Sequence, residues 1–80
     1  MPVRVRYFAG AKAAADRAEE RVAAATVAEL RTALAERHGP GLERILKVAT
    51  ILVDGLTARD EHAPLAEGVT VEVLPPFAGG

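Results

Sequence analysis

The chain opens on a strict alternation of apolar and polar side chains. Residues 3–8 read Val-Arg-Val-Arg-Tyr-Phe. Successive side chains of an extended strand point to opposite faces, so the valines and the tyrosine share one face, and the arginines and Phe8 share the other. This pattern predicts a half-buried strand over residues 3–8.

The next segment carries a weaker pattern. Gly10 interrupts the strand, and residues 11–20 have a helical composition without a well-formed apolar stripe. We therefore expect an exposed connector containing one helical turn, because a helix without such a stripe gains little from packing. Residues 21–24 predict a short second strand.

A helix is clearly indicated over residues 27–38. Thr26 and Glu29 have the spacing of a capping box, in which the threonine caps the Glu29 amide and the glutamate reaches back. Apolar residues then recur at helical spacing along 27–34. The dipeptide Gly39-Pro40 predicts the end of the helix.

The remaining elements follow in quick succession. Residues 42–46 predict a short helical turn that covers the core. Residues 50–53 predict a strand that ends at Asp54-Gly55, a dipeptide typical of tight turns. Residues 57–68 are polar and turn-rich, and residues 69–74 predict a final strand with its valines on one face.

This order of elements predicts an α+β fold, the β-grasp or ubiquitin-like arrangement. One main helix would pack across a mixed sheet of four or five strands. The first and last strands of this fold are central parallel neighbours, which places Phe8 and Leu74 together at one end of the exposed face. Such an apolar pair is a candidate docking patch, and the alternative is two incidental surface residues. We assign residues 1–75 to the domain and 76–80 to an extended tail.

The tail combines a stiff stem, an aromatic residue and a slim tip. Pro75 and Pro76 favour an extended backbone, whereas Gly79 and Gly80 could enter a narrow channel. We interpret Phe77 as an anchor in a partner groove, the alternative being that it packs on the domain's own core. The predicted reactive group is the main-chain carboxylate of Gly80, with Gly79 beside it. The predicted partner-binding residues share this end of the fold: Phe8, Leu74, Pro75, Pro76, Phe77 and Ala78.

Composition narrows the classes of function. With 80 residues the chain forms one small domain. The formal net charge of −1 and pI of about 6.1 argue against nucleic-acid and anionic-membrane partners. Since no membrane span or secretion signal is recognisable, we expect a cytoplasmic protein.

Cysteine is absent, and His38 and His62 belong to no ligand motif, so we expect both histidines on the surface and no metal site. The pattern indicates a carrier rather than a catalyst.

Several segments together resemble a known family. They are Tyr7-Phe8-Ala9, Thr26-Val27-Ala28-Glu29-Leu30, Val53-Asp54-Gly55, Pro64-Leu65, Glu67-Gly68 and Leu74-Pro75-Pro76-Phe77-Ala78-Gly79-Gly80. With them the chain resembles, over its whole length, the small prokaryotic sulfur carriers of the MoaD/ThiS family. Within that family it is most similar to the molybdopterin synthase small subunit.

The resemblance implies a chemistry for Gly80. A carboxylate with a pKa of about 3.5 is ionised at neutral pH and is a poor electrophile. An E1-like adenylyltransferase would activate it with ATP and Mg²⁺, and a persulfide donor would convert the adenylate to a thiocarboxylate. The large subunit of molybdopterin synthase would then receive this tip, and the present chain would be a non-catalytic sulfur-carrier subunit in molybdenum cofactor biosynthesis. No cofactor is expected on the chain itself.

Three other functions remain open at this point. A carrier of the same family could serve thiamine, cysteine or a thiolated natural product. A ubiquitin-like modifier would be joined to lysines of other proteins through Gly80. A plain interaction domain would use its tail only as a flexible end.

Overall fold

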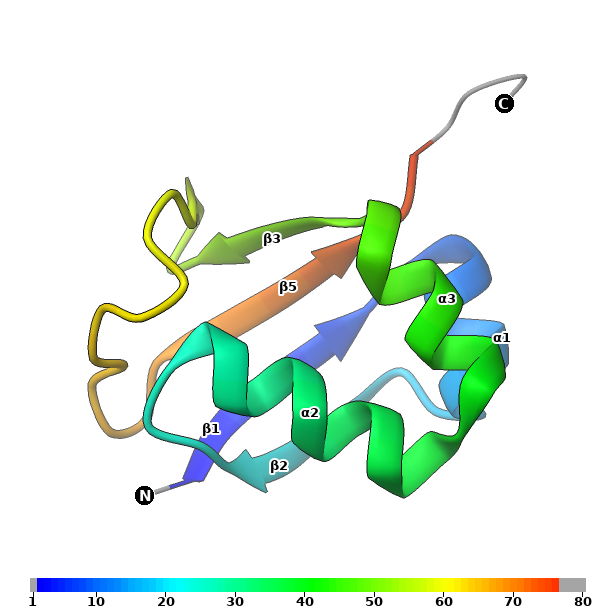
Figure 1. The fold of residues 1–80 in the computed structure, drawn as a ribbon, viewed down its shortest axis with the longest axis horizontal. Coiled ribbons are helices and arrows are strands. Elements are labelled where there is room, and N and C mark those ends of the chain that lie inside the picture. Colours follow the sequence, from blue (N-terminus) through cyan, green and yellow to red (C-terminus); the bar gives the residue numbers. More distant parts are fainter. Residues whose placement is uncertain (1, 77–80) are drawn as a thin grey trace.

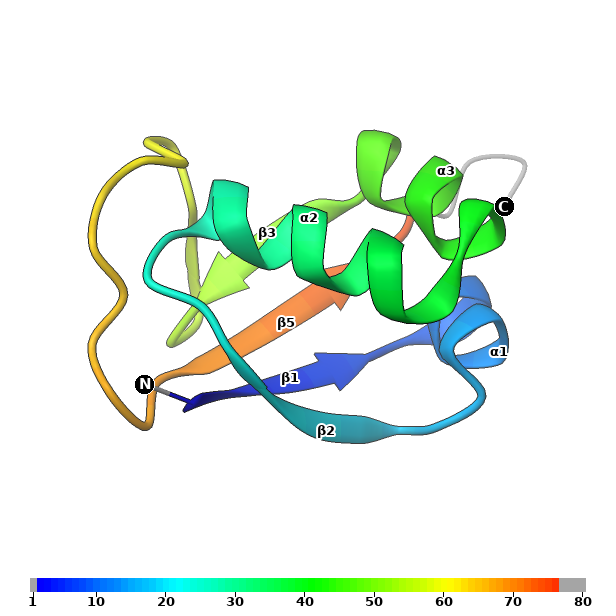
Figure 2. The same ribbon diagram turned by 60° about the horizontal axis from the view of Figure 1, so that its bottom comes forward.

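The computed structural model describes residues 2–76, which form one mixed β-sheet with helices packed on one face (Figure 1). The strands are β1 (Pro2–Tyr7), β2 (Glu19–Ala23), β3 (Thr50–Val53), β4 (Leu56–Thr57) and β5 (Thr70–Leu74). The helices are α1 (Ala9–Ala15), α2 (Val27–His38) and α3 (Pro40–Val48). Figure 2 shows α2 and α3 over the sheet and α1 at the end where β1 stops.

The first and last strands are the central parallel pair of the sheet, as predicted. Its strand order is β2-β1-β5-β3-β4. β1 and β5 run parallel from the pair Arg4–Thr70 to the pair Tyr7–Val73, and β2 and β3 flank them in antiparallel orientation. This arrangement confirms the β-grasp prediction.

The core lies between the sheet and the helices. Val3, Val5 and Tyr7 of β1 are at most 2% exposed, as the alternation of the sequence predicted. Leucines of α2 and α3 pack against the same cluster, and each contributes about 1.5–3 kcal/mol on burial. The opposite side of the sheet, called the open face below, carries Arg4, Arg6, Glu19, Arg21, Glu72 and Leu74 among its outward side chains.

The start of α2 and the β3–β4 turn both form where the sequence predicted them. The Glu29 N–H donates to Thr26 Oγ1 at 3.1 Å, and the Ala25 N–H donates to the Glu29 carboxylate at 3.3 Å. The first bond is the predicted threonine cap at the start of α2, whereas the glutamate reaches back to the residue before the N-cap rather than to the N-cap amide of a standard capping box. In the β3–β4 turn Asp54 and Gly55 both adopt positive φ, at +50° and +83°, as tight hairpins require.

The prediction of an exposed connector with one helical turn after β1 was right about the helical structure but wrong about its length and its burial. Residues 9–15 form α1, in which Ala11 and Ala15 are at most 2% exposed. One helical turn separates these two alanines, so they form a narrow buried edge that does not register as an apolar stripe. Gly10 lies within this helix rather than breaking the strand. A Cβ added at Gly10 would lie 3.9 Å from the Ile45 side chain, so α1 packs close to α3.

Further boundaries differ from the sequence prediction. Pro40 follows the end of α2 and is also the first residue of α3. At this position the missing N–H of proline removes no intrahelical hydrogen bond. The helical turn expected at 42–46 extends over nine residues. β2 begins at Glu19, two residues before the predicted start.

Candidate functional site

The end of the open face holds the predicted docking residues. Tyr7–Val73 is the last parallel pair of β1 and β5, and Phe8 and Leu74 directly follow it at the same end of the sheet. Both side chains are half-buried. Their role in docking remains a prediction.

The Arg6 guanidinium lies over the Phe8 ring. Its guanidinium carbon lies 5.5 Å from the centre of the ring, within the range of a cation–π contact. Arg6 Nη1 also lies 3.9 Å from Glu72 Oε2. The guanidinium is therefore shared between the ring and a carboxylate of the neighbouring strand. The sequence holds a signal for this contact, since residues two apart on a strand share one face.

The chain leaves the core at the proline pair. Pro75 is buried and Pro76 is exposed. Phe77, Ala78, Gly79 and Gly80 lie outside the described residues, so their predicted roles and the division at residue 75 remain predictions.

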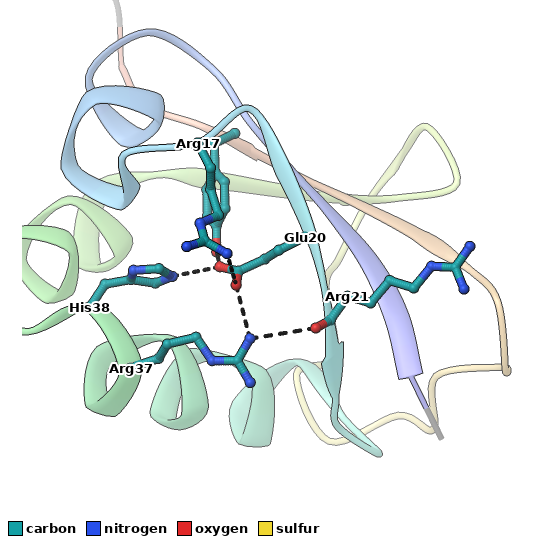
Figure 3. A network of polar contacts seen from close by, with 6 residues as sticks. Arg17, Glu20, Arg21, Arg37 and His38 are labelled. Atoms are coloured by element: carbon teal, nitrogen blue, oxygen red, sulfur yellow. Dashed lines mark hydrogen bonds and ion pairs between the residues drawn. The ribbon is translucent and has the colours of Figure 1, made fainter.

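A buried carboxylate network lies at the same end of β1, on the helix side of the sheet (Figure 3). The Glu20 side chain is 4% exposed. The Tyr7 hydroxyl donates to its Oε2 at 2.5 Å, and His38 Nε2 lies 2.5 Å from the same oxygen. Arg37 donates to Oε1 at 2.9 Å, and Arg17 Nη1 lies 3.5 Å from it.

The network shifts the titration of two groups. Burial alone would raise the pKa of Glu20, but the hydrogen bonds from Tyr7, His38 and Arg37 outweigh it and lower that pKa to about 2. For Tyr7, burial followed by the hydrogen bond to Glu20 raises the pKa of the phenol above its ordinary value. The folded state therefore favours an ionised Glu20 carboxylate beside a neutral Tyr7 phenol. This cluster joins β1, β2 and α2 beside the strand end that leads into Phe8.

The prediction that His38 is a surface residue was wrong. Its side chain is 10% exposed, and its ring packs edge-on against Tyr7 with ring centres 6.0 Å apart. His62 is exposed, as expected. Within residues 2–76 no group of three or more acidic or histidine side chains is placed to hold a metal ion. No helix in that range is both long and apolar enough to cross a bilayer.

Comparison with known protein families shows to which family the chain belongs. The model of the ThiS family matches residues 5–80. The chain belongs to the ThiS family. The resemblance to MoaD/ThiS sulfur carriers is thereby confirmed, together with the ubiquitin-like carrier or modifier fold. The comparison with curated proteins gives no match.

Solved structures place the ThiS-family chain among small carriers and modifiers. SAMP1 from Haloferax volcanii is 26% identical with a TM-score of 0.85, each chain being covered completely. A chain of the complex of subunits 1 and 2 of molybdopterin-converting factor from Helicobacter pylori 26695 is 30% identical, with a TM-score of 0.76 and both chains fully covered. The putative molybdopterin-converting factor subunit 1 from Pyrococcus furiosus is 25% identical with a TM-score of 0.81, covering 96% of this chain and 99% of the other.

Proposed function

We propose that this chain is the sulfur carrier of molybdopterin biosynthesis and that the Gly80 carboxylate carries the sulfur. The observation that supports this most is the point at which the backbone leaves the sheet after β5. β5 ends beside β1, Pro75 is buried, and the exposed Pro76 follows at the end of the sheet that presents Phe8 and Leu74. The family match extends to residue 80.

The proposed chemistry proceeds in three steps. In an E1-like partner a Gly80 oxygen attacks the α-phosphorus of ATP, with Mg²⁺ as the counter-ion, and pyrophosphate leaves. The terminal sulfur of a protein persulfide then attacks the acyl carbon and AMP leaves, which gives an acyl disulfide. A second thiol cleaves the S–S bond, so the sulfur stays on Gly80 as a thiocarboxylate. Its anion is a soft nucleophile that suits attack on a carbon of the pterin precursor.

The proposed partner is the large subunit of molybdopterin synthase. The Helicobacter pylori relative was solved in complex with subunit 2 of its converting factor. On the present chain, Phe8 and Leu74 would meet such a partner, with Phe77 as an anchor worth about 2 kcal/mol or more. Holding the tip in the partner's pocket would supply the sulfur at high effective concentration. No catalytic residue is assigned to this chain.

A protein modifier is the second candidate, because SAMP1, a small archaeal modifier protein, shares the fold at a TM-score of 0.85. Both functions begin with the same adenylate. They differ in the nucleophile, which is a sulfur for the carrier and a lysine amine for the modifier. Carriers for thiamine, cysteine or a thiolated natural product would differ only in the enzyme that accepts the sulfur.

Intact-mass spectrometry tests the proposal. The chain is incubated with the E1-like enzyme of the same organism, ATP, Mg²⁺, a persulfide donor and a thiol. The carrier function predicts the mass gain of one oxygen replaced by sulfur, and omission of ATP is the control. An unchanged mass, although the enzyme forms AMP and pyrophosphate, would contradict it. Gly-Gly remnants on lysines of other proteins, without thiocarboxylate, would favour the modifier.

A further inference from the structure

Two arginines face each other directly on the open face. Arg4 of β1 and Arg21 of β2 are partners in the antiparallel register. The Arg4 N–H donates to Val69 O at 2.9 Å on the other side of β1, so Arg4 and Arg21 form a non-hydrogen-bonded pair. Cross-strand side chains approach each other most closely in such pairs. Like charges in this position destabilise a sheet.

The open face does not neutralise this pair internally. Arg4 lies 3.9 Å from Glu19, and Glu72 lies 3.9 Å from Arg6. Among residues 2–76 no carboxylate comes within ion-pair distance of Arg21, which is exposed. Figure 3 shows its guanidinium directed away from Glu20 and Arg37. One positive charge is therefore left unmatched beside another arginine.

A hollow adjoins the two arginines. It has a volume of about 180 Å³ and is lined by Pro2, Val3, Arg4, Arg21, Glu67 and Gly68. Glu67 lines it without reaching ion-pair distance of either arginine in the described structure. Two guanidiniums that border one hollow can hold a carboxylate by charge-assisted hydrogen bonds.

We propose that Arg4 and Arg21 receive an aspartate or glutamate of the protein that docks on the open face. This inference rests on the proposed function, since it adds an electrostatic contact to the same docking event. Four residues of strand separate Arg4 from Phe8, which is about 13 Å. A partner footprint of about 800 Å² covers both positions. Without the partner the arginines repel each other, and with it they share one carboxylate.

The charge reversal Arg21→Glu separates this role from a structural one. In the free chain it places opposite charges across the strand pair, so the melting temperature should rise. In the complex it places like charges together, so the affinity should fall by roughly tenfold or more and the salt dependence should weaken. Higher stability combined with weaker binding is not expected of a residue that only supports the fold. Arg59→Glu is the matched control, since Arg59 is exposed in the loop before β5 and forms no ion pair within residues 2–76. The melting temperature and the partner affinity of this variant should both match those of the wild type.

Binding is measured by calorimetric titration at low and high ionic strength, against the large molybdopterin synthase subunit and against the E1-like enzyme. Wild-type affinity of Arg21→Glu for both proteins would overturn the inference while leaving the proposed function intact. If the wild type binds neither protein, the proposed function itself fails. If Arg21→Glu is unfolded by circular dichroism, Arg21→Gln replaces it, with the same direction expected for binding. Preferential binding of the wild type to a short oligonucleotide, lost on charge reversal, would overturn the choice of a protein carboxylate.

Discussion

Replacing the buried Glu20 by glutamine should destabilise the fold in a way that depends on pH. The pKa of Glu20 is lowered from 4.5 to about 2 in the folded state. The side chain is only 4% exposed, and the lowered pKa corresponds to a stabilisation of the folded state by about 3 kcal/mol when the carboxylate is ionised. For an 80-residue domain such a contribution is a large share of the expected free energy of unfolding of about 4–12 kcal/mol.

The sign of the pH dependence follows from the lowered pKa. The carboxylate contributes its full stability above pH 4.5 and loses it as the pH falls toward 2. Glu20→Gln has no such titration. The free-energy difference between wild type and variant should therefore be about 3 kcal/mol at pH 7 and shrink steadily below pH 4.5.

Urea unfolding at pH 7, 4.5 and 3 measures this difference, with circular dichroism as the signal. Glu19→Gln is the control because Glu19 is the exposed neighbour whose ion pair with Arg4 spans 3.9 Å. Exposed pairs contribute at most about 1 kcal/mol. A Glu20→Gln effect below about 1 kcal/mol at pH 7, or one that does not change with pH, would refute the electrostatic account of the network.

Three further changes test the core, the anchor and the tip. Ala11→Leu should destabilise the domain by about 1–3 kcal/mol in urea unfolding, because Ala11 is fully buried; wild-type stability would mean that α1 does not pack as described. Phe77→Ala should weaken partner binding in calorimetry more than it lowers the melting temperature, whereas equal losses would show that Phe77 packs on its own domain. An extra alanine after Gly80 should abolish thiocarboxylate formation in the mass assay at unchanged melting temperature, and retained thiocarboxylation would exclude Gly80 as the acceptor.

The sequence predicted those parts of the fold whose signals are local. Alternation of valines identified β1 and β5, and the spacing of Thr26 and Glu29 identified the start of α2. The parallel pairing of the central strands followed from the order of elements, which also brought Phe8 and Leu74 to one end. The strands and the helix start depend on periods and caps within a few residues, whereas the parallel pairing depends on the fold that the order of elements indicates.

The missed features depend on contacts between distant segments. α1 packs through alanines, whose burial shows no amphipathic pattern. Glu20 binds Tyr7 and His38 at separations of 13 and 18 residues, so it could be read only as part of a polar connector. The Arg4–Arg21 pair likewise exists only through the register of β1 and β2.

Following the sulfur atom tests the central claim most directly. The chain is thiocarboxylated with radiolabelled sulfur, purified, and mixed with the large molybdopterin synthase subunit and its pterin precursor in a single turnover. The account predicts that the label moves to the small-molecule product while the chain returns to its carboxylate mass. Label that stays on the chain, or that is released as free sulfide without entering the product, would contradict it.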